Sequence, residues 1–353
     1  DRPRQMSSAE LDEALLAALR RIAPAAVKRP LERLARAWRE ATRAQVEPYQ
    51  AHEDLPERLV GAMLQASSAI ADHLADAPEV PAPGLQRFYF DLLAFTRLAE
   101  RFGEHSLFDT TLRKGLRGRS VSTLCIRNLL PAPHLAPRYE AARSTVLFSA
   151  TLAPTAYYQD SLGLPTATQA ITVASPFDAG QLSVRLARGI STRWADRARS
   201  VQPIADLIAR QFEERPGNYL AFFSSYDYLD RVASDLAERH PHVPAWAQSA
   251  RMTEAGRLAS IGRFAAGGQG VGFAVLGGSF GEGIDLPGDR LVGAFIATLG
   301  LPQVNPVNEL LRRRLGAAFG SGFEYAYLYP GLRRVVQAAG RVIRTPEDPG
   351  VVW

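Results

Sequence analysis

The stretch NYLAFFSSYDYLDRVASDLAERH (218–240) begins with a short, almost wholly apolar run and continues, after two serines, with a helical pattern. A run that is apolar on both faces is typical of a strand buried in a parallel sheet. The spacing of apolar residues in DYLDRVASDLAERH favours an amphipathic helix. The stretch therefore predicts one strand–helix unit of an α/β fold.

The same alternation extends on both sides of this unit, from about residue 120 onward. A helical stretch, ADRARSVQPIADLIARQFEE (195–214), precedes it. The other predicted strands are VSTLCI (121–126), STVLFS (144–149), LSVRLA (182–187), VGFAVL (271–276) and LVGAFIAT (291–298). Apolar runs joined by helices predict a mostly parallel sheet covered on two sides, and ligands of such sheets bind at the carboxyl ends of the strands.

Up to about residue 105 the periodicity is helical. Ser7 and Glu10 fit a capping box, and Leu11, Leu15 and Leu19 then fall on one stripe. Three more helices are indicated by apolar stripes around 31–38, 59–74 and 85–102. We expect an all-helical module of four helices here, and no sheet.

The composition restricts the class of protein. The 353 residues, 46% of them hydrophobic, suffice for two or three domains, and a net charge of +5 tolerates nucleic acid without requiring it. The single cysteine, Cys125, excludes a disulfide framework and a thiolate-built metal site, and the six histidines are scattered, so no metal site is expected. No apolar run approaches the ~20 residues of a membrane span, and no signal peptide is evident. We expect a cytoplasmic protein without membrane partners.

The run QAAGRVIR (337–344) places charges among apolar residues. On a helix, Gln337, Arg341 and Arg344 stand at i, i+4 and i+7 and would share one face. Two guanidinium groups beside a glutamine suit the γ-phosphate of a nucleotide. Gly340, expected in mid-helix, indicates close packing. The alternative is ordinary surface arginines.

The loop LGGSFGEGIDLPG (276–288) has five glycines in thirteen residues, which allow its backbone to approach a phosphate or sugar. Glu282 and Asp285 are acids in this loop, which could serve a ribose hydroxyl, an arginine or a metal ion. The alternative is a solvated turn.

Three further groups are candidates for contact with nucleic acid or for coupling. Ser224 and Ser225 occupy a helix start, where an anion can bind, although an N-cap explains one of them equally well. The run LRKGLRGR (112–119) carries Arg113, Lys114, Arg117 and Arg119, and either phosphate contacts or a solvated turn would account for it. Ser149 and Thr151 follow the predicted strand 144–149, and a plain strand end is the competing interpretation. Arg312, Arg313 and Arg314 could track a strand of nucleic acid or be ordinary surface charge.

No GxxxxGK followed by Ser or Thr occurs in the sequence. The chain therefore has arginines suited to a nucleotide but no phosphate-cradling loop. A half-site of this kind is expected where two parallel-sheet domains share one nucleotide.

Taken in order, SATLAP, FFSSY, GGSFGEGIDLPG and QAAGRVIRTPEDPG resemble motifs III, IV, V and VI of superfamily 2 DNA helicases of the XPD/DinG (Rad3-related) type. The opening DRPRQMSSAELD also resembles the segment after the DEAH box in bacterial members. The resemblance implies a fragment that runs from just after the DEAH box through motif VI. Its implied parts are a helical Arch-like domain (1–110), the end of helicase domain 1 (111–175) and a RecA-like helicase domain 2 (176–353).

The resemblance also implies roles for matching residues. Arg341 and Arg344 would reach the γ-phosphate, and Gln337 would sense it. The implied nucleotide-binding set also includes Glu282, Gly283, Asp285 and Gly340, with Gly283 allowing the loop to close. Ser149 and Thr151 would couple the DEAH region to strand movement, and Ser224 and Ser225 would hold phosphates of DNA.

The implied function is that of an ATP-dependent 5′→3′ helicase that translocates on single-stranded or forked DNA in repair. ATP and Mg²⁺ would be held mainly by the upstream helicase domain 1 of the same protein, which could also carry an iron–sulfur cluster of the 4Fe–4S type. This chain alone would then be inactive. A non-catalytic nucleic-acid-binding module that keeps the helicase fold is the alternative. A nuclease is disfavoured because no paired-carboxylate or histidine-rich constellation is evident.

Overall fold

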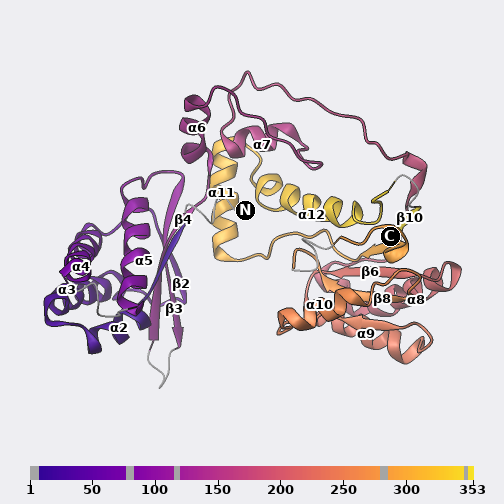
Figure 1. Cartoon of the computed structure of the whole chain (residues 1–353), viewed down its shortest axis with the longest axis horizontal. Coiled ribbons are helices and arrows are strands. Elements are labelled where there is room, and N and C mark those ends of the chain that lie inside the picture. The colour runs from indigo at the N-terminus through magenta and orange to yellow at the C-terminus, as the bar shows by residue number, and fades with distance from the viewer. Residues whose placement is uncertain (1–7, 77–82, 115–119, 279–284, 346–348) are drawn as a thin grey trace. The chain divides into compact units, whose positions relative to one another are not determined.

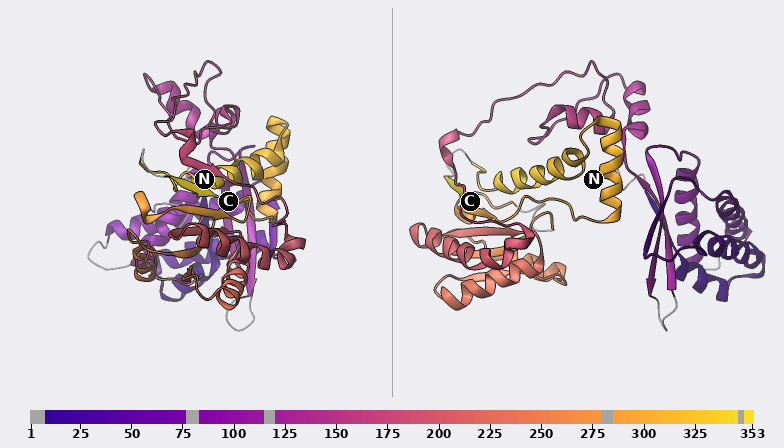
Figure 2. Two further views of the ribbon diagram at one scale, coloured as in Figure 1. Left: turned by 90° about the vertical axis from the view of Figure 1, so that its right-hand side faces the viewer. Right: turned by 180° about the vertical axis from the view of Figure 1, so that it is seen from behind.

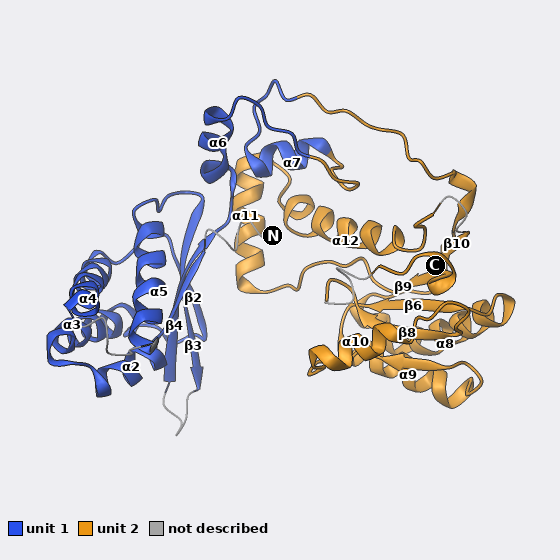
Figure 3. Cartoon of the chain, viewed as in Figure 1, with its two compact units in different colours: residues 1–147, 155–168 blue, residues 148–154, 169–353 orange. Residues whose placement is uncertain are grey.

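The computed structural model describes residues 8–76, 83–114, 120–278, 285–345 and 349–353. Figure 1 shows its helices and strands, and Figure 3 shows its two compact units. Unit 1 comprises Asp1–Leu147 and Thr155–Thr168, and unit 2 comprises Phe148–Pro154 and Gln169–Trp353. Each unit encloses its own apolar core.

Unit 1 is a four-stranded antiparallel sheet with strand order β1-β4-β3-β2, and helices cover one of its faces (Figure 2). The strands are β1 (Ala9–Asp12), β2 (Tyr49–His52), β3 (Ser106–Lys114) and β4 (Ser120–Asn128). The covering helices are α2 (Glu13–Ile22), α3 (Ala25–Thr42), α4 (Glu57–Asp76) and α5 (Pro83–Ala99). Two further helices, α6 (Ala132–Ala141) and α7 (Thr155–Leu162), follow the sheet.

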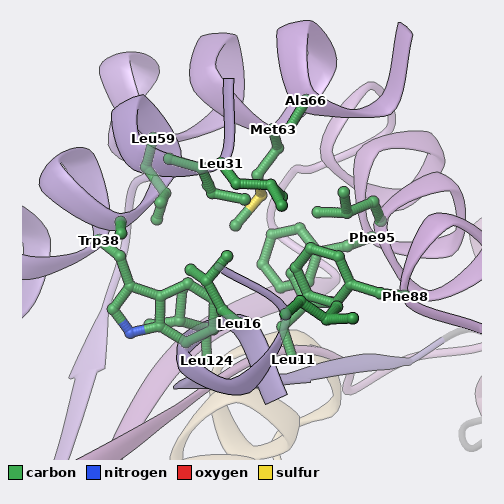
Figure 4. Packing of buried hydrophobic residues seen from close by; sticks show 14 of the residues in the cluster. Leu11, Leu16, Leu31, Trp38, Leu59, Met63, Ala66, Phe88, Phe95 and Leu124 are labelled. Atoms are coloured by element: carbon green, nitrogen blue, oxygen red, sulfur yellow. The ribbon is translucent and has the colours of Figure 1, made fainter. Parts of the chain in front are cut away.

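The core of unit 1 joins the four helices to the sheet (Figure 4). Trp38 of α3, Leu16 of α2 and Leu124 of β4 are all almost fully buried in it. The Trp38 indole Nε1 donates a hydrogen bond of 2.7 Å to Ser122 Oγ, which in turn lies 2.6 Å from Glu13 Oε2. The buried indole N–H is thereby satisfied, as a core tryptophan requires.

The four predicted helices are confirmed, but the expectation of an all-helical module is wrong because β1 and β2 belong to it. Leu11 fits an apolar helix stripe and equally the inward face of a strand, and it lies in β1. The helix begins at Glu13, where the Asp12 side chain accepts a 2.8 Å hydrogen bond from the Ala14 N–H. Glu10 is therefore in a strand, and Ser7 lies outside the described residues. Local periodicity did not reveal β1 because its partner, β4, is far along the chain.

Two other predicted features take different places in the fold. The predicted strand 121–126 forms, but within antiparallel β4, and the expected boundary between residues 110 and 111 falls inside β3. The predicted strand 144–149 does not form. No described strand pairs with it, and Val146 and Phe148 are 80% and 90% exposed. A buried parallel strand needs neighbours for its backbone groups, so an apolar run alone is not sufficient.

Unit 2 contains a six-stranded, wholly parallel sheet with strand order β5-β10-β9-β6-β8-β7. Its strands are β5 (Leu182–Val184), β6 (Asn218–Phe223), β7 (Ala245–Ala247), β8 (Gly270–Val275), β9 (Gly293–Ile296) and β10 (Gly350–Val352). Its α-helices are α8 (Arg197–Glu214), α9 (Tyr226–Arg239), α10 (Glu254–Gly262), α11 (Pro306–Phe319) and α12 (Tyr329–Ala339). Shorter helical turns are η2 (Ala179–Gln181), η3 (Trp194–Asp196), η4 (Gly288–Arg290) and η5 (Glu324–Leu328).

Helices cover both faces of the parallel sheet, as the sequence predicts. Along β6, Tyr219 and Phe223 pack with α8 and α9 in one core, whereas Leu220 and Phe222 pack with Ala338 of α12 in the other. Because successive side chains point to opposite faces, a run that is apolar throughout is buried on both. The other predicted strands of this sheet are confirmed: 182–187 and 291–298 in shorter form as β5 and β9, and 271–276, shifted by one residue, as β8.

The longest of the described helices, α4, has 20 residues but carries four charged side chains. None of the described helices combines the length and the hydropathy that a membrane span requires.

Candidate functional site

The central strands of unit 2 end together at one edge of the sheet. Phe223 of β6 lies opposite Val275 of β8, and Phe222 lies opposite Ile296 of β9. The segments that follow these three strands therefore start side by side. This carboxyl edge is where ligands of parallel sheets bind.

Ser225 and Ser224 follow β6, and their hydroxyls do different things. Ser225 is the N-cap of α9, and its Oγ accepts a 3.3 Å hydrogen bond from the Tyr228 N–H. The Ser224 Oγ is buried and has no hydrogen-bond partner among the described residues. The N-cap interpretation thus accounts for Ser225, while the Ser224 hydroxyl keeps its capacity to donate.

The glycine-rich loop begins after β8 with a left-handed residue, Gly277, whose φ is +82°. Just before it, the Val275 N–H donates a 3.1 Å hydrogen bond to Oε1 of Gln248, a side chain only 6% exposed. Gln248 follows β7 and was not singled out from the sequence. A glutamine directly after a short apolar run was the available signal, and it is a weak one.

Arg334 of α12 contacts the exits of two strands. Its Nη1 donates a 3.2 Å hydrogen bond to the carbonyl oxygen of Gly300, four residues after the end of β9. A Cβ placed on Gly277 would lie 3.2 Å from its Cδ and Nε. Both glycines have positive φ, so neither loop accepts a larger residue without strain. Arg334 was also missed by the sequence reasoning, although it stands three residues before Gln337.

Arg344 and Asp285 form an ion pair, with 3.2 Å between Nε and Oδ1. The side chains are 36% and 77% exposed, so the pair is open to solvent. It links the segment after α12 to the carboxyl end of the glycine-rich loop. Glu282 and Gly283 of that loop lie outside the described residues.

The expectation that Gln337, Arg341 and Arg344 share one helix face is wrong. Helix α12 ends at Ala339, and Gly340 is its C-cap, with a 2.9 Å hydrogen bond from its N–H to the Val336 carbonyl. Gly340 is therefore not in mid-helix. The chain leaves the helix because Val342, 1% exposed, packs beside Gly350 of β10 in the sheet core. Gln337 lies on the helix, and the two arginines lie in the segment after it.

The remaining candidates for coupling and for phosphate contact lie in a local turn and in unit 1. Ser149 and Thr151 form the turn, in which Thr151 N–H donates to Ser149 Oγ at 3.2 Å. In unit 1, Arg113 of β3 forms an ion pair with Asp12, so the basic cluster at 112–119 has an acidic neighbour that its own sequence does not show. Lys114 ends the same strand, and Arg117 and Arg119 lie outside the described residues.

Helix α11 presents Arg312, whose Nε pairs with Glu309 Oε2 at 3.0 Å. The Tyr327 hydroxyl donates a 2.8 Å hydrogen bond to the same carboxylate. The hydrogen bond from Tyr327, followed by the one from Arg312, lowers the pKa of Glu309. Burial, followed by the hydrogen bond to Glu309, raises the pKa of Tyr327 to about 12. Of the three consecutive arginines 312–314, Arg312 is thus paired with a carboxylate of its own helix.

Comparison with known proteins agrees with the geometry. A family model for the helicase C-terminal domain matches residues 208–353. A probable ATP-dependent helicase of Methanocaldococcus jannaschii is 27% identical over 253 residues, which are 66% of this chain and 37% of that protein. The ATP-dependent DNA helicase DinG of Photobacterium profundum is 27% identical over 234 residues, 61% of this chain and 32% of DinG.

The ATP-dependent DNA helicase XPD of Sulfolobus acidocaldarius is 23% identical over 218 residues, 60% of this chain and 38% of XPD. The chain thus spans about a third of the length of these relatives. An apo XPD structure is similar with a TM-score of 0.59 at 19% identity, covering 99% of this chain and 69% of that one. A second XPD helicase structure has the same TM-score and identity, and the match covers 99% of this chain and 61% of that one. The predicted α/β fold class with a RecA-like helicase sheet is confirmed.

Proposed function

We propose that the chain, which is similar to XPD and DinG helicases and matches a helicase C-terminal domain over residues 208–353, is the arginine-bearing, DNA-binding part of an ATP-dependent 5′→3′ DNA helicase. One observation carries the proposal. The Arg344–Asp285 pair joins the segment between α12 and β10 to the glycine-rich loop after β8, and both of its side chains are open to solvent.

The arginines fit a nucleotide triphosphate. Arg344 is 36% exposed, and its paired carboxylate, at 77%, is still more open to solvent. Such a pair is weak, about 0 to 1 kcal/mol, so a more highly charged anion can compete for the guanidinium. We propose that Arg341 and Arg344 bind the γ-phosphate of ATP and that Gln337 senses it. The remainder of the proposed nucleotide-binding site consists of Glu282, Gly283, Asp285 and Gly340. Arginines in this role offset charge that develops during phosphoryl transfer.

The phosphate cradle and the Mg²⁺ ligands belong in this proposal to helicase domain 1, since the chain has no GxxxxGK sequence. The chain alone is then expected to hydrolyse no ATP. The one cysteine, Cys125, is buried, and desolvation raises its pKa to about 12. Any cluster of the 4Fe–4S type would require cysteines outside these 353 residues.

For DNA, we propose that Ser224 and Ser225 hold backbone phosphates at the start of α9, and that Ser149 and Thr151 couple strand movement to hydrolysis. The Ser224 hydroxyl, buried and without a partner among the described residues, supports the first assignment. Lys114, Arg113, Arg117 and Arg119 are proposed to add phosphate contacts. Translocation on single-stranded or forked DNA, a role in repair and a cytoplasmic location complete the proposal.

A second candidate is a non-catalytic nucleic-acid-binding module with the helicase fold. The ion pair of Arg344 with Asp285 favours this second candidate, because the guanidinium already has a counter-charge within the protein. Under this alternative the arginines are structural, and their loss lowers stability while DNA-stimulated hydrolysis is absent from the start.

The test measures DNA-stimulated ATP hydrolysis and single-stranded DNA binding by a protein in which these residues are joined to the phosphate-binding domain. Arg341→Ala and Arg344→Ala should each abolish hydrolysis, by about 10³-fold or more, while DNA binding is largely kept. Arg188→Ala, which removes another exposed arginine of unit 2, is the matched control and should leave turnover unchanged. Near-normal turnover in both arginine variants would contradict the proposal.

A further inference from the structure

Two histidines that follow α9 lie beside two carboxylates of α8. His240 and His242 directly follow α9, and Glu213 lies in the last turn of α8. One ring nitrogen of each histidine and one carboxylate oxygen of Glu213 all lie within 4.8 Å of one another. His240 and His242 are two residues apart in the sequence, but the acid that completes the group lies 27 residues before His240.

The group is held in place by the backbone. His240 is the C-cap of α9, with its N–H donating to the Leu236 carbonyl at 2.8 Å, and the Val243 N–H donates to the His240 carbonyl at 3.0 Å. Val243 is 3% exposed, which fixes the turn that carries His242. Helices α8 and α9 pack in the same core, so Glu213 is presented from a rigid neighbour.

Each histidine also has a carboxylate partner. His242 Nε2 lies 2.8 Å from Glu213 Oε1, and His240 Nε2 lies 2.8 Å from Asp206 Oδ1. Asp206 precedes Glu213 by two helical turns and therefore shares its side of α8. When His240 donates its Nε2–H to Asp206, its Nδ1 keeps a lone pair. An imidazole oriented in this way by a carboxylate is the arrangement that metal-ligating histidines commonly have.

We propose that Glu213, His240 and His242 bind one divalent transition-metal ion, with Zn²⁺ as the fitting ion, and that Asp206 orients His240. Two imidazoles and one carboxylate suit zinc, whose tetrahedral ligands stand about 3.4 Å apart at bond lengths of about 2.1 Å. Glu213 and His242 are 57% and 53% exposed, so their side chains are free to rotate to this spacing and solvent completes the coordination.

The charge around the group is compatible with one cation. Arg239, the residue before His240, is a positive group whose Nη2 pairs with Asp206 Oδ1 at 2.6 Å. Glu213 supplies the formal negative charge to the ion. The ion would join α8 to the turn after α9 and so tie together two helices that cover one face of the sheet.

The experiment titrates Zn²⁺ into the chain, prepared without a histidine tag and stripped of metal, and follows binding by calorimetry and the melting temperature. One Zn²⁺ per chain should bind, and the ion should raise the melting temperature. His242→Ala and Glu213→Gln should abolish both effects, and Asp206→Asn should weaken binding by about 10- to 100-fold. Glu214→Gln, which changes the neighbouring carboxylate, is the matched control and should bind Zn²⁺ as the unchanged chain does.

Melting temperatures of the metal-free variants show that each one folds. Absence of saturable Zn²⁺ binding in the unchanged chain would overturn the proposal. So would binding that persists in His242→Ala and is lost in His134→Ala, because it would place the ion at the other described histidine pair, His105 and His134, whose rings are 4.9 Å apart.

Discussion

Arg344 and Asp285 pair at 3.2 Å although 59 residues separate them in the sequence. The carboxylate is 77% exposed, and water therefore weakens the attraction. The pair therefore positions the guanidinium group but binds it only weakly. That combination suits a residue that exchanges its partner when a phosphate arrives, and it leads to the first prediction.

Asp285→Asn should change the free energy of unfolding by less than about 1 kcal/mol, because exposed ion pairs contribute little. Urea denaturation of the chain measures this. Arg127→Met is the contrast, since it leaves the carboxylate of Asp109, which is fully buried in unit 1, without its ion-pair partner. Leaving a buried charge without its partner costs about 3 to 5 kcal/mol. Equal costs for the two variants would show that the Arg344–Asp285 pair is a structural bridge.

Alanine substitutions of the two serines after β6 should have different effects on the free energy of unfolding. Ser225→Ala removes the N-cap of α9 and should cost about 1 kcal/mol of unfolding free energy. Ser224→Ala removes a buried hydroxyl that has no partner among the described residues, and it should leave stability unchanged or raise it slightly. Thermal or urea unfolding distinguishes them. A loss above about 1 kcal/mol in Ser224→Ala would mean that its hydroxyl is needed for folding.

Arg334→Met keeps an aliphatic stem beside Gly277 but removes the hydrogen bond to the Gly300 carbonyl. Because a bond from a charged donor contributes about 1.5 to 3 kcal/mol, the free energy of unfolding should fall by that amount. Hydrogen exchange should increase in the segments after β8 and β9. Arg188→Met, an exposed arginine elsewhere in unit 2, is the control and should change neither quantity. Unchanged exchange in Arg334→Met would exclude a role in holding the two loops.

Asp206 should make the stability of unit 2 depend on acid. Hydrogen bonds from His240 and then Arg239 lower its pKa, so the folded state binds the proton less readily than the unfolded state. The resulting stabilisation is present above the usual aspartate pKa of about 3.9 and is lost as the pH falls through the lowered value. Asp206→Asn should reduce the dependence of the unfolding free energy on pH in this acidic range. An unchanged pH profile would show that other carboxylates dominate it.

The sequence alone was enough to predict the parallel sheet of unit 2 and its helices. A strand such as β6, apolar at nearly every position and followed by serines and an amphipathic helix, carries its fold class in local periodicity. The resemblance of its four motifs to XPD and DinG helicases was also evident, and the comparisons agree with it.

Only the tertiary structure decided which residues meet. It revealed that β1 pairs with β4, that α12 ends at Ala339 because Val342 is buried against β10, and that Gln248 and Arg334 hold the exits of β8 and β9. It also brought Glu213 to His240 and His242. Each of these depends on contacts between segments far apart in the chain. Local periodicity records how a segment buries its own faces, whereas the identity of its neighbours is set by packing of the whole unit.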